Sequence, residues 1–210
     1  MSATPALLST LHQTVARLVG SFDAIPAQRK ELLGQFANMI RERLDAKQAL
    51  HLNFICTHNS RRSHISQIWA QAAAYYYDVQ GVVCFSGGTE ATAFNPRAVR
   101  AMQSAGFDVS QVMGGGNPVY EVRFAETAKP LAAFSKKYDD PFNATPFVAV
   151  MTCSHADQNC PVVLGASARI ALTYDDPKEF DGTPQEAAKY DERVAEIGRE
   201  LLYAFSLVKN

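Results

Sequence analysis

A short apolar strand that runs directly into a polar turn and an amphipathic helix is the feature that most constrains how this chain folds. Residues 52–56 (LNFIC) are typical of the strand, and residues 57–60 (THNS) are rich in turn formers. The following helix carries apolar side chains at helical spacing, namely Ile65, Ile68, Trp69, Ala72 and Tyr76. Because parallel strands need a crossover connection, usually a helix, this order favours a parallel sheet.

The alternation of strands and helices continues along the chain. We expect further strands at residues 82–85, 147–153 and 169–174. Asn95-Pro96 is typical of a helix N-cap and first helical residue, and Gly106 is typical of the C′ position that ends the same helix. The pattern predicts a three-layer α/β sandwich with a four-stranded parallel sheet that helices cover on both faces.

The last helix has its own start signal. Thr183-Pro184-Gln185-Glu186 predicts a capping box with proline at the first helical position. The helix after it presents one apolar face, formed by Tyr190, Val194, Ile197, Leu201 and Phe205. We therefore expect a long amphipathic helix to close the sandwich.

Two parts of the chain fall outside this alternation. Residues 1–50 predict an N-terminal helical extension before an α/β domain at residues 51–210, with Pro26 near the start of the second of two amphipathic helices. The extension is expected to pack on the domain or to support a homodimer, and both alternatives stay open. Residues 112–146, with Gly114-Gly115-Gly116 and several prolines, predict an insertion or lid rather than a unit of the core.

Charge and cysteine content exclude several classes of protein. The 210 residues contain 20 Lys and Arg against 21 Asp and Glu, so the net charge of −1 gives no general attraction to nucleic acid or membrane. Transmembrane helices need about 18 or more apolar residues in a row, and the sequence has no such run. The first 20 residues do not resemble a signal peptide, and four cysteines outside a secretory context are expected to be reduced. These features predict a cytoplasmic protein without nucleic-acid or membrane partners.

The candidate site begins at Cys56, one of three cysteines at or just beyond the end of a predicted strand, where open α/β sheets bind ligands. A loop between strand and helix can turn its backbone N–H groups inward and cradle an oxyanion. The same dipoles would stabilise a nucleophilic thiolate at Cys56, and the planar fork of Arg62 can hold two oxygens of a tetrahedral anion. The predicted oxyanion-binding residues are Thr57, His58, Asn59, Ser60, Arg61, Arg62 and Ser63. Of these, Ser63 could also form a hydrogen bond with the thiolate.

This loop, CTHNSRRS, resembles the phosphate-binding loop of the low-molecular-weight protein tyrosine phosphatases and of the thioredoxin-coupled arsenate reductases built on the same fold. The segment FSGGTEATAFNPRAVRAMQSAGFDVS is similar to their second strand and following helix. The resemblance spans about residues 51–110 and 147–208. It implies that Cys56 is the nucleophile, that Arg62 clamps the oxyanion, and that Asn59 and Ser63 organise the loop.

The resemblance also implies a general acid. The family places this acid in an Asp-Pro pair after the fourth strand, which here is Asp176-Pro177. An acid beside a bound phosphate would protonate the leaving oxygen. Asp175 is the competing candidate, and an ordinary turn aspartate is the structural alternative. The following residues, Lys178-Glu179-Phe180, are not the paired tyrosines of many phosphatases in the family, which weakens the case for a phosphotyrosine substrate.

Cys153 and Cys160 lie seven residues apart just beyond the third predicted strand. On an intact helix their thiols would be about 10 Å apart along the axis, too far for a disulfide unless the backbone moves. The Cys-x6-Cys-Pro segment closely resembles the redox helix of the arsenate reductases. Two alternatives stay open: a pair of small hydrophobic residues, or a zinc site with His155, whose spacing is unusual for zinc.

The resemblance implies a thiol relay in which Cys56 attacks arsenate, Cys153 attacks the Cys56 sulfur, and Cys160 forms the disulfide that thioredoxin reduces. The leading hypothesis is therefore an arsenate reductase that uses thioredoxin or another thiol reductant and no metal or other cofactor. The first alternative is a phosphatase that hydrolyses phosphotyrosine in proteins, or small phosphomonoesters, through a Cys56 phosphoenzyme. The second is a binding module whose loop only holds an anion.

Four residues near these motifs carry further expectations. Gln67 stands where some arsenate reductases have a glutamate associated with potassium, which argues against that cation here. We expect His58 to be a loop-packing residue, Arg61 to point to solvent or to the flank of a substrate, and Cys84 to lie in the core.

Overall fold

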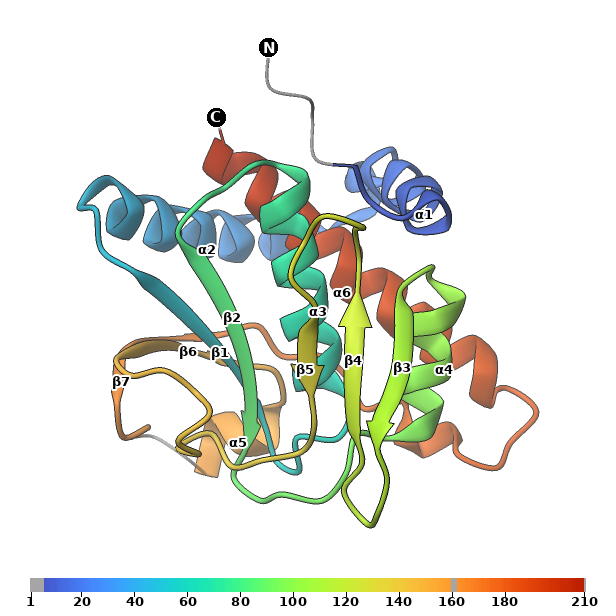
Figure 1. Cartoon of the computed structure of the whole chain (residues 1–210). Helices are drawn as coiled ribbons and strands as arrows, with labels where there is room; N and C mark the ends of the chain where they lie inside the picture. The colour runs from blue at the N-terminus through green and yellow to red at the C-terminus, as the bar shows by residue number, and fades with distance from the viewer. Residues whose placement is uncertain (1–5, 160–161, 210) are drawn as a thin grey trace.

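Four parallel strands form the central sheet of the computed structural model, which describes residues 6–159 and 162–209 (Figure 1). The strands are β1 (Leu50–Cys56), β2 (Val82–Gly88), β6 (Phe147–Met151) and β7 (Ala166–Ala171), in the order β2-β1-β6-β7. The predicted three-layer α/β fold with a four-stranded parallel sheet is confirmed. Because neighbouring strands are parallel, the ends of β1 and β6 that carry Cys56 and Cys153 meet at the same edge of the sheet.

Most helices begin and end close to the predicted positions. The helices are α1 (Ser9–Val19), α2 (Ala27–Asp45), α3 (Arg62–Tyr76), α4 (Pro96–Ser104), α5 (Ser154–Asn159) and α6 (Glu186–Lys209), with short 3₁₀ turns η1 (Phe22–Ala24) and η2 (Pro177–Phe180). The last helix begins at Glu186 rather than at Pro184, and the Glu186 carboxylate accepts from Gly182 N instead of Thr183 N, so the predicted capping box is wrong in detail. The Asn95 side chain accepts a hydrogen bond from the backbone N of Arg97, and Gly106 follows the helix with a φ of +103°, as expected for the two ends of α4. No helix in the described part of the chain is long and apolar enough to cross a membrane.

The buried apolar side chains fall into two clusters. Leu52 and Phe54 of β1 belong to a large cluster that α3 and α6 cover, whereas Ile55 and Cys56 belong to a smaller second cluster. That second cluster also contains Cys153. The apolar face predicted for α6 is buried in the large cluster.

The N-terminal helices cover their apolar faces within the chain. Leu11, Val15 and Leu18 of α1 and Leu33, Phe36 and Ile40 of α2 are buried in the large cluster, where both helices contact α6. This is the packing role expected for the extension. A homodimer through these helices and a domain boundary at residue 50 stay predictions.

A second sheet follows α4 and was not predicted. Its strands β3 (Asp108–Met113), β4 (Val119–Arg123) and β5 (Leu131–Ala133) are antiparallel in the order β3-β4-β5. Tyr120, Val122 and Ala133 belong to the large cluster, so the expectation that residues 112–146 lie outside the core is wrong. Tyr120, Val122 and Phe124 alternate as in a strand, but the nearby glycines and prolines favoured an irregular segment.

Candidate active site

Cys56 ends β1, and the first turn of α3 lies directly beyond it (Figure 1). Its Sγ lies 3.0 Å from the Oγ of Ser63, and both side chains are buried. A strand end and a helix N-terminus thus enclose one thiol, the arrangement that the Cys-x5-Arg spacing predicts.

The backbone of the loop after Cys56 turns its carbonyl groups outward. Four carbonyl oxygens accept hydrogen bonds from outside the loop: Cys56 from Thr89 N (3.1 Å), Thr57 from Glu90 N (2.8 Å), His58 from Thr92 Oγ1 (3.1 Å) and Ser135 Oγ (3.0 Å), and Ser60 from Asn95 N (2.8 Å). In a trans peptide the N–H of the next residue points the opposite way, so the amides of residues 57, 58, 59 and 61 face the inside of the loop. No backbone amide of residues 57–62 donates to another described group. Because buried N–H groups are almost always paired, this ring of donors suits an oxyanion.

Asn59 holds the shape of the loop. Its φ of +44° lies in the left-handed region, which asparagine tolerates better than most residues. Its side-chain Nδ2 donates to Ser63 Oγ (2.9 Å) and its Oδ1 accepts from the backbone N of Lys136 (2.9 Å). A Cβ on Gly88 would lie 2.7 Å from Asn59 N, so the end of β2 must be glycine for the loop to pack against it.

Arg62 links the loop to the segment after β7. Its Nη1 donates to the carbonyl of Tyr174 (2.8 Å) and its Nη2 donates to Asp176 Oδ2 (2.7 Å). Its Nε is buried and has no acceptor among the described residues. Two N–H groups of this planar guanidinium are already bonded, and the unpaired Nε–H can donate to an oxygen of a bound anion.

The two candidate acids differ in position. The side chain of Asp176 is 30 % exposed, contacts Arg62 and accepts a hydrogen bond from Lys178 N at the start of η2. The side chain of Asp175 is 97 % exposed and lies 3.7 Å from Arg193. Both line, with Arg62 and Ser154, a hollow of about 630 Å³. The geometry therefore favours Asp176 as the group that meets a ligand held by Arg62.

Cys153 follows the end of the neighbouring strand β6 by two residues and shares the smaller buried cluster with Cys56. Thr152 donates both its backbone N–H (2.7 Å) and its hydroxyl (2.9 Å) to the carbonyl of Ile55, which ties the two strand ends together. Cys153 is 1 % exposed, and its Sγ accepts a hydrogen bond from Ala156 N (3.3 Å) and lies 3.6 Å from Thr57 Oγ1. Cys160 lies outside the described residues.

His64 and Lys136 complete the surroundings of the loop, and sequence reasoning missed both. The Nδ1 of the buried His64 lies 2.9 Å from Ser86 Oγ and 3.4 Å from Asn59 Nδ2. Burial, with the nearby charge of Lys136, holds the pKa of His64 well below its ordinary value, so the ring is neutral. No sequence pattern around His64, which directly follows Ser63, indicated that it would contact the loop.

Lys136 is 2 % exposed although lysine is almost never buried. Its Nζ lies 4.5 Å from the centroid of the Phe134 ring and 5.2 Å from that of Phe142, a cation–π arrangement. Burial lowers its pKa to about 8, against the opposing effect of Asp140. The insertion thus brings a buried ammonium group to the back of the oxyanion loop.

Lys136→Met is expected to change how stability depends on pH. Between about pH 8 and 10.5 the unfolded chain holds the Lys136 proton more tightly than the folded chain, so the wild-type protein gains stability as pH rises. Methionine does not titrate. The free energy of unfolding of Lys136→Met relative to that of the wild type should therefore fall across this range by up to about 3 kcal/mol. Urea unfolding at several pH values measures this difference. The exposed neighbour provides the control Lys137→Met, which should show no such trend. A pH-independent difference for Lys136→Met would contradict the buried ammonium.

Other predicted residues lie elsewhere. The expectation that Arg61 points to solvent or to a substrate is wrong, because its side chain donates to Tyr190 Oη (2.7 Å) and Asp181 Oδ2 (3.3 Å). His58 is exposed, with its Nε2 3.7 Å from a Glu90 carboxylate oxygen. Cys84 is buried in the core as expected, and burial raises the pKa of its thiol.

Gln67, the residue discussed for potassium, is buried at the edge of the main sheet. Its Nε2 donates to the carbonyl of Cys84 on edge strand β2 (3.1 Å). Over residues 6–159 and 162–209 no group of three His, Cys, Asp or Glu side chains is placed to hold a metal ion. The zinc alternative includes Cys160, which is outside that part of the chain.

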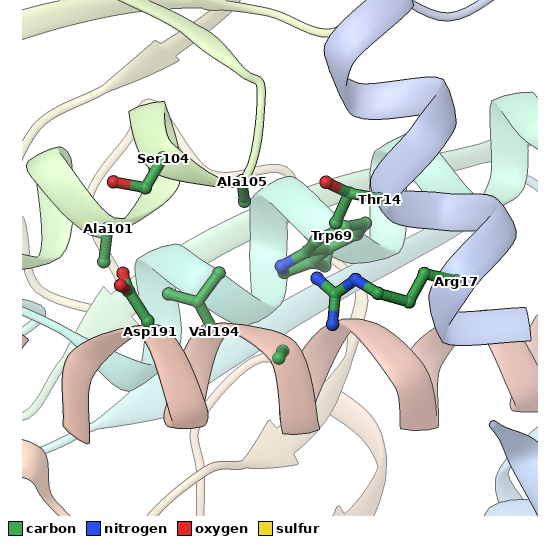
Figure 2. A pocket seen from close by; sticks show the side chains of 9 residues that line it. Thr14, Arg17, Trp69, Ala101, Ser104, Ala105, Asp191 and Val194 are labelled. Carbon is green, nitrogen blue, oxygen red and sulfur yellow. The ribbon is translucent and has the colours of Figure 1, made fainter. Parts of the chain in front are cut away.

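A smaller cavity of about 150 Å³ lies between α1, α3, α4 and α6 (Figure 2). Figure 2 shows Trp69 and Arg17 facing it from two helices, with Asp191 on a third. None of the predicted catalytic or oxyanion-binding residues lines this cavity. This cavity therefore lies apart from the candidate site.

Comparison with known proteins agrees with the geometry. No family model matches the chain. It is 30 % identical to an arsenate reductase of Halalkalibacterium halodurans and 31 % identical to one of Bacillus subtilis, each over 149 residues that cover 70 % of this chain and 89 % of the relative. A crystal structure of a YwlE mutant from Bacillus subtilis superposes with a TM-score of 0.53 at 15 % identity, covering 77 % of this chain and 99 % of the other, which supports the fold alone.

Proposed function

Because this chain belongs to the arsenate reductase family, we propose that it reduces arsenate to arsenite through Cys56, Cys153 and Cys160, with a thioredoxin-type dithiol as reductant. The observation that carries the proposal is the ring of inward amides around a buried thiol whose neighbouring strand end holds a second thiol. We further propose that the protein works in the cytoplasm, where thioredoxin and glutathione keep such thiols reduced.

Arsenate binding would use the loop and Arg62 together. The amides of residues 57, 58, 59 and 61 and the Nε of Arg62 would donate to the tetrahedral anion, which replaces Asp176 as a partner of the guanidinium. Phosphate has the same shape and charge and would bind the same way. The thiol chemistry, rather than binding, would distinguish the two anions.

The relay proceeds in three displacements. The Cys56 thiolate bonds to arsenic and displaces one oxygen, which leaves as water after protonation. The Cys153 thiolate then bonds to the Cys56 sulfur, and the electron pair of the sulfur–arsenic bond passes to arsenic, so that As(V) becomes As(III) and arsenite leaves. Cys160 attacks Cys153, which releases the Cys56 thiolate, and the external dithiol reduces the Cys153–Cys160 disulfide.

The adjacent strand ends support the second displacement, because Cys56 and Cys153 share one buried cluster and the Sγ of Cys153 lies 3.6 Å from the Oγ1 of Thr57, the residue that follows Cys56. The burial of both thiols keeps competing water and bulky oxidants away from the adduct. Attack by Cys160 then moves the disulfide away from Cys56, so that the external dithiol can reduce it.

Cys160→Ser tests the relay. The variant is expected to release one arsenite per protein and then stop in an assay that couples thioredoxin reduction to NADPH, because the disulfide offered to thioredoxin cannot form. Hydrolysis of an aryl phosphate should continue, since it needs neither Cys153 nor Cys160. Cys84→Ala is the matched control, because Cys84 is a buried core residue of β2, and it should keep full turnover. Sustained turnover by Cys160→Ser would count against the three-cysteine relay.

One observation favours phosphomonoester hydrolysis as a second candidate function. Asp176 contacts Arg62 and could protonate the leaving oxygen of a phosphate ester held there. Asp176→Asn is then expected to lower the kcat of aryl-phosphate hydrolysis by about 10²-fold or more. Asp175→Asn is the control, because that exposed side chain lies against Arg193 and its loss should leave the rate unchanged. An unchanged rate for Asp176→Asn rejects the role.

A further inference from the structure

A buried ion pair joins the N-terminal extension to the last helix. Arg29 of α2 donates from Nε (2.9 Å) and Nη2 (2.8 Å) to one carboxylate oxygen of Glu200 on α6. The side chains are only 18 % and 5 % exposed. Because an unpaired buried carboxylate is costly, Arg29 is held firmly by Glu200.

The same guanidinium lies over the ring of Tyr174, with Cζ 4.8 Å from the ring centroid. Tyr174 is buried, and its carbonyl is the acceptor that anchors Nη1 of Arg62 at 2.8 Å. Its backbone N–H donates to the carbonyl of Thr152, one residue before Cys153. Two contacts therefore lead from the N-terminal extension to the arginine of the oxyanion site.

From these contacts we infer that Arg29 is a positioning residue: it fixes Tyr174 and thereby orients the guanidinium of Arg62 for oxyanion binding. The inference rests on the proposed function, because it concerns the same oxyanion site. It gives helix α2 a task in ligand binding as well as in packing.

The shape of arginine matters here as much as its charge. The planar group donates to Glu200 with two N–H groups while its Cζ lies over the phenol ring, a combination that a lysine ammonium cannot reproduce. Burial raises the pKa of Tyr174 well above its ordinary value, so the ring under Arg29 is the neutral phenol.

The experiment separates positioning from simple stabilisation. In Arg29→Met/Glu200→Met both charges are removed, so no buried charge is left unpaired and the fold should keep its thermal midpoint. The probe is inorganic phosphate, and the readout is its protection of Cys56 from iodoacetamide, followed by mass spectrometry of the Cys56 peptide. We expect the apparent Kd for phosphate to rise about tenfold in the double variant, since a desolvated cation–π contact has that order of strength.

A neighbouring residue supplies the matched control. Lys30→Met removes a cation of the same helix that lies 5.8 Å from the Tyr203 ring centroid, away from Tyr174, and should leave the phosphate Kd unchanged. Arg29→Lys keeps the charge but loses the planar contact, and its Kd should rise by about threefold.

Each result decides. A double variant that binds phosphate as tightly as the wild type overturns the inference, and an unchanged Kd for Arg29→Lys overturns it equally, because that variant keeps Glu200, which also interacts with Tyr174. If phosphate never protects Cys56 in the wild-type protein, the proposed function fails at its binding step and the inference falls with it. Weaker binding in the double variant with Lys30→Met unaffected supports the inference.

Discussion

Cys153→Ser is expected to lower multiple-turnover arsenate reduction to background, a loss of at least about 10³-fold, because a serine hydroxyl cannot form a disulfide with Cys56. The rate of aryl-phosphate hydrolysis should change by less than about threefold, since water hydrolyses the cysteinyl-phosphate at Cys56 and no second thiol takes part. Initial rates of NADPH oxidation in a reconstituted thioredoxin system, beside aryl-phosphate hydrolysis on the same preparation, measure both.

The structure makes this substitution a clean one. Cys153 Sγ accepts a hydrogen bond from Ala156 N, and a serine oxygen can accept the same bond, so the start of α5 should be preserved. Cys56→Ser is the paired variant, and it should lose both activities because it removes the first nucleophile. Arsenate turnover by Cys153→Ser at a tenth of the wild-type rate or more would show that Cys153 is not the second thiol.

Arg62→Lys is expected to lower kcat/KM about 10²- to 10³-fold for arsenate and for aryl phosphates alike, the range seen when one oxyanion donor is removed. Lysine keeps the charge but lacks the planar fork that donates both to the carbonyl of Tyr174 and to the anion that replaces Asp176. Steady-state kinetics with both substrates provide the measurement.

The adjacent arginine is the control for that experiment. Arg61 donates to Tyr190 and Asp181, and its Nε lies 3.9 Å from Asp176 Oδ1, a charge that lysine keeps, so Arg61→Lys should cost less than about fivefold. Equal losses for the two arginines would indicate that the loop as a whole has been disturbed, and a loss below tenfold for Arg62→Lys would contradict its assigned role.

The parallel sheet could be predicted because each of its strands is a short apolar run followed by a turn or helix signal. The end of β2 was placed three residues too early, since Ser86-Gly87-Gly88 has the composition of a turn. These glycines continue the strand because other backbones approach them: a Cβ on Gly87 would lie 2.3 Å from the Cα of Tyr138. Such a contact joins residues about fifty positions apart, and no local pattern carries it.

The antiparallel sheet was missed for a related reason. The glycines and the proline of residues 114–118 concealed β4, and the polar run of residues 126–129 before Pro130 concealed the short β5. Their apolar residues are buried only because the sheet packs into the large cluster.

The candidate site was predictable where its residues are close in sequence. Cys56, Asn59, Arg62 and Ser63 belong to one motif, and the structure brings them together within it. Lys136 and Arg29 reach the site from distant segments, and their burial depends on tertiary packing. Arg61 was misplaced because its partners Tyr190 and Asp181 come from the far end of the chain.

Trapping the first disulfide is the most direct test of the central claim. Cys160→Ser protein, reduced and then freed of thiols, is treated with arsenate and digested without reduction for mass spectrometry. The relay predicts a linked pair of peptides containing Cys56 and Cys153, one arsenite released per protein, and neither product when phosphate replaces arsenate. Arsenite formed without any Cys56–Cys153 link would contradict the account.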